Sequence, residues 1–475
     1  MKLLQMAAAS LFLAGCMNPP KYDPPKPEMP AEWRVEEPFR VATPKDDAPK
    51  GAWWERFGDP TLNELASRSL GTSPTLAASV ARLAQARANF TAVAGQQWPQ
   101  VSLAARDSRT RITQNRPLNN YSAPNFSTVQ TDLFVGAQAS YELDFGGRVA
   151  SLVASARASA EQSAADLETA RLLLVADLAT AYFNLRQTDI ELDVLANSIE
   201  LQQRSLGVAT TRRELGAGSA LDVAQQQALI DTTLTQIDIL RRQRASFENA
   251  LATLTGTPAP LFSVKADKRD IVPPDVPIGV PSDVLERRPD VASAERAMAA
   301  ANAQVGIANA AFYPSISLGL SYGQESRRPN TLFDAPSVVW SGGLSLLQPL
   351  FDGGRIRGGY EAAKAGYDIA VANYRRTVLT AMQEAEDGIL GLAALERASK
   401  QANIAVESAR RTLDLVNARY EGGIANPLEV IVAQQQLLNA ERLASQLVGQ
   451  RLITSVFLVK ALGGGWERRD QLSVK

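Results

Sequence analysis

The chain has 475 residues, which accommodates two or three ordinary domains, and its 49 basic and 50 acidic side chains nearly cancel, which gives no indication of a nucleic-acid partner. Histidine is absent and cysteine occurs once, at Cys16, which excludes histidine acid–base catalysis and any disulfide or metal site built on such side chains. We therefore expect a protein that is not an enzyme, with no catalytic residue, no metal site and no cofactor.

Residues 1–15 have the pattern of a bacterial lipoprotein signal peptide. Lys2 supplies a positive charge, and the mostly apolar run over residues 3–13 is too short to span a bilayer. The sequence Leu-Ala-Gly-Cys that ends at Cys16 resembles a lipobox, in which the cysteine is acylated and becomes the mature N-terminus. The alternative is an ordinary signal peptide that happens to hold a cysteine. Met17 follows, where an aspartate would usually retain a lipoprotein in the inner membrane, so the resemblance implies an acyl anchor in the outer membrane.

Residues 16–52 are predicted to form an acylated, proline-rich tether. Prolines disfavour regular helix and favour extended polyproline geometry. We expect this segment to carry the chain from the lipid headgroups along the side of the folded body. The prolines are Pro19, Pro20, Pro24, Pro25, Pro27, Pro30, Pro38, Pro44 and Pro49.

The remaining chain contains two copies of one unit. Gly146 and Gly147 recur as Gly353 and Gly354, 207 residues later. The segment at residues 216–223 recurs at residues 423–430, with the same offset. A shared order at a constant offset indicates an internal duplication. The predicted domains are a first repeat over residues 53–262, a linker over 263–284, a second repeat over 285–466 and a C-terminal tail over 467–475.

Long helices are predicted in both repeats. Residues 125–257 and 350–426 contain no proline, and residues 148–215 are rich in helix-forming side chains. Such a run reaches on the order of 100 Å, is too polar to be a transmembrane helix, and is stable only when packed along its length. Apolar residues at helical spacing predict one buried stripe: Leu167, Ala170, Leu174, Leu178, Ala181 and Leu185.

Alternating segments predict one β-hairpin in each repeat, at about 100–145 and 314–351. Within each strand the apolar residues share one face, as Leu133, Val135 and Ala137 do, and small polar residues occupy the other. This pattern over about ten residues is typical of a transmembrane β-barrel, and a soluble sheet with one wet face is the alternative. The predicted strands are residues 100–112, 131–145, 315–324 and 338–348. The aromatic residues near their ends fit an interfacial girdle: Trp98, Phe145, Phe312, Tyr313 and Phe351.

Four strands are too few for one chain to close a barrel. About eight strands is the practical minimum, and an open edge in lipid leaves backbone groups unpaired at several kcal/mol each. Two chains would give eight strands and three would give twelve. The small residues on the inner face fit a wide lumen, which favours three.

Several longer motifs resemble the TolC-like outer-membrane factors, specifically the acylated branch that serves resistance–nodulation–division efflux pumps. The resemblance covers nearly the whole mature chain. The motifs are residues 53–60 (WWERFGDP), 285–291 (LERRPDV), 301–308 (ANAQVGIA), 312–318 (FYPSISL) and 461–466 (ALGGGW).

The resemblance implies a mainly α-helical fold with a membrane β-barrel part. Three identical chains would form a twelve-stranded outer-membrane barrel, continuous with a long periplasmic α-helical barrel and built on the internal two-fold repeat. The implied partners are a periplasmic adaptor (membrane fusion) protein, an inner-membrane resistance–nodulation–division transporter and outer-membrane lipids.

The implied function is the exit duct of a tripartite efflux pump, which passes drugs or other small molecules out of a Gram-negative cell. A type I protein-secretion duct is one alternative, although the acyl anchor and the motif at 461–466 favour the efflux branch. A structural lipoprotein spacer between outer membrane and cell wall is another, although a spacer needs no alternating strands.

The turns between paired helices are predicted at the periplasmic tip, around Gly216, Gly218, Gly423 and Asn426. Asp222 lies three residues after Ser219, and Glu429 lies three residues after Asn426. This is the spacing of a capping box, so both carboxylates are predicted to cap the helices that follow.

The resemblance adds a gating role for the same region. It implies that Tyr420 and Asp222 are gate residues, and we hypothesise that a hydrogen bond between them holds the pore shut. It also implies that Glu429 lines an acidic ring. The family's gate arginine position holds Ala425 here, and a second acidic position holds Val432.

The charged motif at residues 287–290, Arg-Arg-Pro-Asp, resembles an anion site. We expect it instead to begin the first helix of the second repeat, with its arginines in a salt-bridged surface network.

Overall fold

The structure is a computed structural model that describes residues 51–111, 129–267, 271, 273–274 and 287–464. Cys16, most of the tether, most of the linker, the 113–130 loop apart from its last two residues, and the tail at 467–475 lie outside the described residues. The chain divides into two compact units. The sheet unit contains Leu83–Gln162 and Ala294–Tyr374, and the helical unit contains the described parts of Pro27–Arg82, Ser163–Ser293 and Arg375–Lys475. Each unit therefore combines segments of both repeats.

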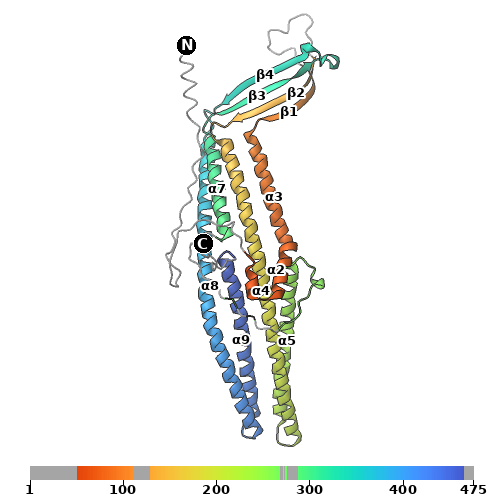
Figure 1. The fold of residues 1–475 in the computed structure, drawn as a ribbon, viewed down its shortest axis with the longest axis vertical. Coiled ribbons are helices and arrows are strands. Elements are labelled where there is room, and N and C mark those ends of the chain that lie inside the picture. The colour runs from red at the N-terminus through yellow and green to blue at the C-terminus, as the bar shows by residue number, and fades with distance from the viewer. Residues whose placement is uncertain (1–50, 112–128, 268–270, 272, 275–286, 465–475) are drawn as a thin grey trace, which may run out of the picture. The chain divides into compact units, whose positions relative to one another are not determined.

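The sheet unit holds four antiparallel strands in the order β1-β2-β3-β4 (Figure 1). All four predicted strands are confirmed, with bounds that differ by no more than two residues. The pairing of β2 with β3 joins the hairpin of one repeat to that of the other. The strands are β1 (Gln100–Arg111), β2 (Val129–Leu143), β3 (Ser315–Ser326) and β4 (Val338–Leu347).

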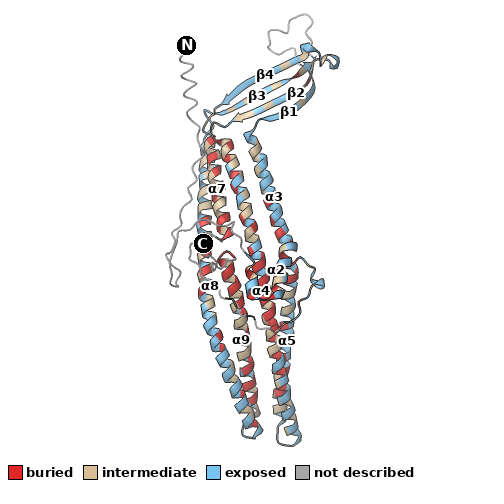
Figure 2. Cartoon of the chain, viewed as in Figure 1, coloured by how far each residue is buried: buried red, intermediate tan, exposed pale blue. Residues whose placement is uncertain are grey.

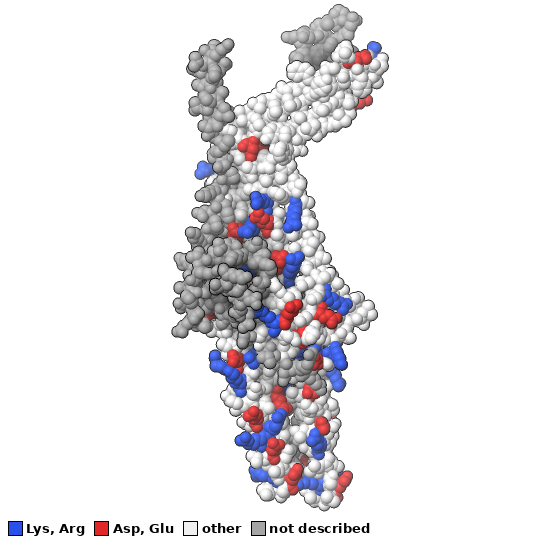
Figure 3. Space-filling view, viewed as in Figure 1, with Lys and Arg blue, Asp and Glu red and all other residues white. Residues whose placement is uncertain are grey.

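The register places the predicted apolar faces of all four strands on one side of the sheet. Leu103, Ala137, Tyr322 and Trp340 lie opposite one another across the strands, and directly paired residues point the same way. Leu103 is 81% exposed and Trp340 75%, so none of the described residues covers these parts of the apolar face. Figure 2 shows the strands as largely exposed, and Figure 3 shows few charged side chains over the face in view.

The aromatic residues predicted to form a girdle gather at one end of the sheet. Trp98 precedes β1, Phe145 follows β2, Tyr313 precedes β3 and Phe351 follows β4. Because neighbouring strands are antiparallel, these four positions meet at the same end. Phe351 is 93% exposed.

Four helices contribute residues to the sheet unit at this end of the strands: α3 (Pro74–Ala94), α4 (Arg148–Glu214), α7 (Pro289–Ala310) and α8 (Arg355–Glu421). The carboxylate of Asp144 accepts hydrogen bonds from the backbone of Val149 and Ala150 at the start of α4. Asp352 accepts hydrogen bonds from the backbone of Gly354 and Ile356 at the start of α8, and these hydrogen bonds lower the pKa of its carboxyl. Both repeats thus begin their longest helix with an aspartate that satisfies free N–H groups.

The core of the helical unit lies around the middle of α4. The predicted stripe is confirmed for its leucines, which are all buried, whereas Ala170 and Ala181 are half-buried. Phe183 of α4 packs against Phe57, and Leu251 and Val456 belong to the same cluster. The elements packed around this part of α4 are η1 (Trp53–Phe57), α2 (Pro60–Thr72), α5 (Ala220–Leu254) and α9 (Pro427–Ala461), and Figure 2 shows buried residues on α4 and α9. The remaining short helices are η2 (Gly95–Gln97), η3 (Ala259–Leu261), η4 (Pro329–Thr331) and η5 (Ala335–Ser337).

A buried polar chain attaches the WWERFGDP motif to α4. Asp59 caps α2 by accepting hydrogen bonds from the backbone of Thr61 and Leu62, and its other oxygen accepts one from the Tyr182 hydroxyl at 2.6 Å. The same hydroxyl accepts a hydrogen bond from Arg186 at 2.7 Å. Burial, and then the neighbouring Asp59 carboxylate, raise the pKa of Tyr182. The aspartate at the end of the motif therefore has a structural role.

The predicted start of the second repeat's first helix is confirmed, because α7 begins at Pro289. The expected surface network is wrong. Arg288 is buried, forms ion pairs with Asp290 and Glu384 at 2.6 and 2.7 Å, and donates a hydrogen bond to the backbone oxygen of Ala461. Asp290 is a local partner, but Glu384 and Ala461 lie far away in the sequence, so a local pattern could not reveal that Arg288 is buried.

No helix in the described ranges combines the length and the apolar character needed to cross a lipid bilayer.

Candidate gate at the helical turns

Two tight turns of the helical unit connect long helices, one between α4 and α5 and one between α8 and α9 (Figure 1). Gly216 and Gly423 have positive φ angles of 75° and 74°, which glycine adopts without steric cost. Ala217 donates a backbone hydrogen bond to Arg212, and Ile424 donates the equivalent one to Arg419. Each helix therefore ends in a Schellman motif, and the predicted duplication of the turns is confirmed.

The two predicted capping boxes are present. The Asp222 carboxylate accepts a hydrogen bond from the backbone of Ser219, whose hydroxyl caps α5 in return. Glu429 accepts one from the backbone of Asn426 at 3.1 Å, and Pro427 occupies the first helical position of α9. In the described chain both carboxylates thus stabilise the starts of their own helices. Gly218 lies inside the first turn, where an added Cβ would sit 3.1 Å from the backbone nitrogen of Arg213.

Tyr420 lies beside Arg212 of the other turn. The Arg212 guanidinium lies 4.2 Å from the centroid of the Tyr420 ring, and it donates hydrogen bonds to the backbone oxygens of Tyr420 and Glu421 at 2.7 and 3.3 Å. A cation is favourable there because the last carbonyls of a helix carry partial negative charge. Arg212 therefore ties the end of α4 to the end of α8.

The hydrogen bond hypothesised between Tyr420 and Asp222 is not among the contacts of the described residues. Tyr420 is buried with Ala425 and Val430 instead. Ala425 packs in this cluster, while Val432 is 45% exposed. The gating roles of Asp222, Tyr420 and Glu429 stay predictions.

Sequence reasoning missed Arg212 as a member of this site. The duplication offered one signal, because Arg212 aligns with Arg419 at the 207-residue offset, and Arg419 lies 3.7 Å from Glu429. A basic side chain in the last turn of a helix was a second signal. Neither signal could identify the partner, since the contact with Tyr420 joins positions 208 residues apart.

Apolar side chains are exposed at both turns. Leu215 is 77% exposed in the first turn and Ile424 is 75% exposed in the second. A groove of about 530 Å³ lies beside the second turn and is lined by Leu415, Val416, Arg419 and Ile424 among others. Large exposed apolar residues clustered at the end of a helical unit are typical of a protein-binding surface.

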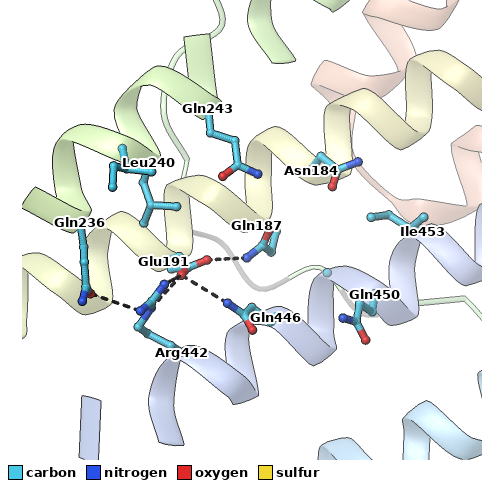
Figure 4. Close-up of a pocket in the computed structure, with 12 residues that line it drawn as sticks. Asn184, Gln187, Glu191, Gln236, Leu240, Gln243, Arg442, Gln446, Gln450 and Ile453 are labelled. Atoms are coloured by element: carbon cyan, nitrogen blue, oxygen red, sulfur yellow. Dashed lines mark hydrogen bonds and ion pairs between the residues drawn. The ribbon is translucent and has the colours of Figure 1, made fainter. Parts of the chain in front are cut away.

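A polar cavity of about 460 Å³ lies farther along the helical unit, between α4, α5 and α9 (Figure 4). Glu191 is buried there and accepts two hydrogen bonds from Arg442, at 2.6 and 2.8 Å. Gln187 and Gln446 donate to the same carboxylate, so its charge is fully paired. The described part of the chain contains no group of three side chains suited to a metal ion. We regard the Glu191–Arg442 pair as a structural crosslink.

Two sequence comparisons identify similar proteins. A model described as outer membrane efflux protein matches residues 65–257 and 280–464. The chain is 31% identical over 472 residues to the pyoverdine export outer membrane protein OpmQ of Pseudomonas aeruginosa, covering 99% of this chain and 98% of that one. It is 32% identical over 470 residues to the toluene efflux pump outer membrane protein TtgC of Pseudomonas putida, covering 98% and 96%.

Solved structures of outer-membrane proteins have a similar fold. The outer-membrane channel OprN matches with a TM-score of 0.85 at 28% identity, covering 94% of this chain and 99% of that one. The outer membrane protein VceC of Vibrio cholerae matches with a TM-score of 0.81 at 26% identity, covering 90% and 100%.

Proposed function

The chain belongs to the outer membrane efflux protein family, and we propose that three copies of it, each acylated at Cys16, assemble into the exit duct of a tripartite pump. The predicted fold class is that of the outer-membrane channels it resembles. It is an outer-membrane efflux protein with a helical extension into the periplasm.

The observation that carries the proposed assembly is a sheet with two free edges and an uncovered apolar face. Within the described residues, β1 and β4 each pair with another strand on one side only. In lipid, every unpaired backbone group would cost several kcal/mol. Pairing β4 of one chain with β1 of the next removes both edges, and three chains supply twelve strands around a wide lumen.

The exposed apolar residues of the two turns support a docking role for the periplasmic tip. We propose that they bind the periplasmic adaptor protein, which connects the duct to an inner-membrane resistance–nodulation–division transporter. The named relatives export pyoverdine or toluene, and we propose small molecules of drug or solvent size as the cargo here. A duct has no bond chemistry to perform, so we propose no enzymatic activity and no cofactor.

The test of the proposed function is conductance of the purified, acylated protein in planar lipid bilayers. We expect discrete channel steps from a trimer that dissociates to monomers on heating. In the host bacterium, deletion of the gene is expected to increase susceptibility to small toxic compounds, and a plasmid copy to restore resistance. A stable monomer that gives no conductance would contradict the proposal.

The gate offers a sharper prediction at Arg212. We expect Arg212→Ala to shift the closed–open equilibrium toward open by about five- to thirtyfold, because it removes about 1–2 kcal/mol of hydrogen bonding between the two turns. Single-channel recording measures the open fraction directly. Tyr420→Phe keeps both the ring and the backbone oxygen that Arg212 contacts and removes only the hydroxyl, so an unchanged gate assigns the effect to Arg212 and a more open gate supports the hypothesised Tyr420–Asp222 hydrogen bond.

Arg204→Ala is a matched control on the same helix. Arg204 forms an exposed ion pair with Glu200 at 2.8 Å and contacts neither turn. If Arg212→Ala and Arg204→Ala both have the same open fraction as the unmodified channel, the hydrogen bonds of Arg212 do not hold the gate closed.

A further inference from the structure

The polar face of the sheet is uncharged over three levels of side chains and becomes charged toward the end where β1 and β3 finish. Three successive levels of side chains across this face carry no charge. The next level places Arg106, Phe134 and Glu325 side by side on β1, β2 and β3. The uncharged levels are Gln100, Ser140, Gly319 and Gly343, then Ser102, Gln138, Ser321 and Ser341, then Ala104, Gly136, Gly323 and Val339.

Phe134 is the only aromatic side chain on the polar face of the four described strands, and it is nearly buried there. Its ring lies along the paired residues Gly136 and Gly323. A Cβ on Gly136 would come within 2.8 Å of the ring, and one on Gly323 within 3.1 Å. The glycine pair therefore makes the space in which the ring lies against the wall of the sheet.

The ring supports a fixed cation. The Arg106 guanidinium lies 5.6 Å from the Phe134 centroid, and its terminal nitrogen lies 2.5 Å from the Asp132 carboxylate. The Arg106 side chain nevertheless remains 57% exposed on the polar face. Charge pairing and stacking both restrain its orientation.

Glu325 carries the remaining charge of this level. It is exposed, it lies opposite Phe134 on the neighbouring strand, and the described residues provide it with no ion-pair partner. Arg106 is paired with Asp132, so Glu325 is the charge at this level of the described strands that has no ion-pair partner.

We propose that Arg106, Asp132, Phe134 and Glu325 form a charge filter at the outer end of the lumen, which favours cationic solutes and slows anionic ones. The inference rests on the proposed function, because the polar face must line a pore shared by three chains. Three Glu325 carboxylates, one from each chain, would then surround the lumen beyond the three uncharged levels of side chains. The Arg106–Asp132 pair keeps the neighbouring cations from cancelling them.

The test is the reversal potential of single channels under a salt gradient, which gives the ratio of cation to anion permeability. For charges about 10 Å from the pore axis, we expect Glu325→Gln to lower this ratio by about two- to fourfold near physiological salt, and by more in dilute salt. Arg106→Gln should raise the ratio, since it leaves the Asp132 carboxylate uncompensated. Glu325→Asp should retain the selectivity of the unmodified channel.

Asp107 provides the matched control. It is the next residue on β1 after Arg106 and is exposed on the opposite face of the sheet, at the level of Leu133. Asp107→Asn should therefore leave the reversal potential unchanged. A conducting Glu325→Gln channel with unchanged selectivity would overturn the filter alone, whereas an unmodified protein that forms no channel would overturn the proposed function and the filter with it.

Discussion

Replacing Leu320 by arginine is expected to reduce the amount of assembled trimer in the outer membrane by about tenfold or more. Leu320 lies near the middle of β3, on the apolar face, and is 49% exposed. An arginine at the midplane of a membrane β-barrel costs about 2–4 kcal/mol, and each chain of the trimer bears that cost. The measurement is the intensity of the heat-dissociable trimer band in outer-membrane fractions.

Ser321→Arg is the control for this prediction, because the neighbouring residue points to the opposite face. Ser321 shares a hydrogen bond with Ser341 and lies on the polar side of the sheet. We expect Ser321→Arg to assemble normally and to alter only the conductance. Equal assembly of both variants would contradict the assignment of the apolar face to lipid.

Arg442→Met is expected to destabilise the helical unit by about 3 kcal/mol. The change leaves Glu191 buried with its charge uncompensated, and breaking a buried ion pair in this way costs about 3–5 kcal/mol. The Arg442 side chain is 27% exposed, which places the effect at the lower end of that range. Thermal unfolding of the detergent-solubilised protein, followed by helical circular dichroism, measures the fall in midpoint.

Two further variants show whether charge is the cause. Adding Glu191→Gln to Arg442→Met removes the buried charge and should restore most of the lost stability. Arg410→Met removes the Arg410–Glu441 pair, in which the arginine is 62% exposed, and should cost less than about 1 kcal/mol. If the double variant is as unstable as Arg442→Met, lost packing of the arginine stem is the cause instead.

The strands and long helices were accessible from sequence because each follows a local rule. Alternation with a period of two determines which residues share a face, so it places Leu133, Val135 and Ala137 together without knowledge of their partners, and the register confirms this. Proline-free runs with a stripe of leucines determined the extent of α4 to within one residue. Capping boxes at Ser219 and Asn426 likewise depend only on residues three positions apart.

The contacts between distant segments could not be predicted in the same way. Arg288 is buried by Glu384 and Ala461, and Arg212 reaches Tyr420 across the boundary between the repeats. No periodicity identifies such partners, because they depend on how two helices pack. The local motif at residues 287–290 consequently predicts a surface position for Arg288, and no local pattern points to the contact between Arg212 and Tyr420.

The pairing of β2 with β3 has a consequence for how the protein is made. Leu143 pairs across to Ile316, and the whole of α4 and α5 is synthesised between them. The β1–β2 hairpin is therefore complete long before its neighbour exists, with an apolar face and an unsatisfied strand edge in water. A two-stranded hairpin is marginal at best on its own, and exposed edges invite aggregation. We therefore expect the translocated chain to need a holding chaperone in the periplasm until the sheet is complete, and neither repeat expressed alone to supply a stable sheet.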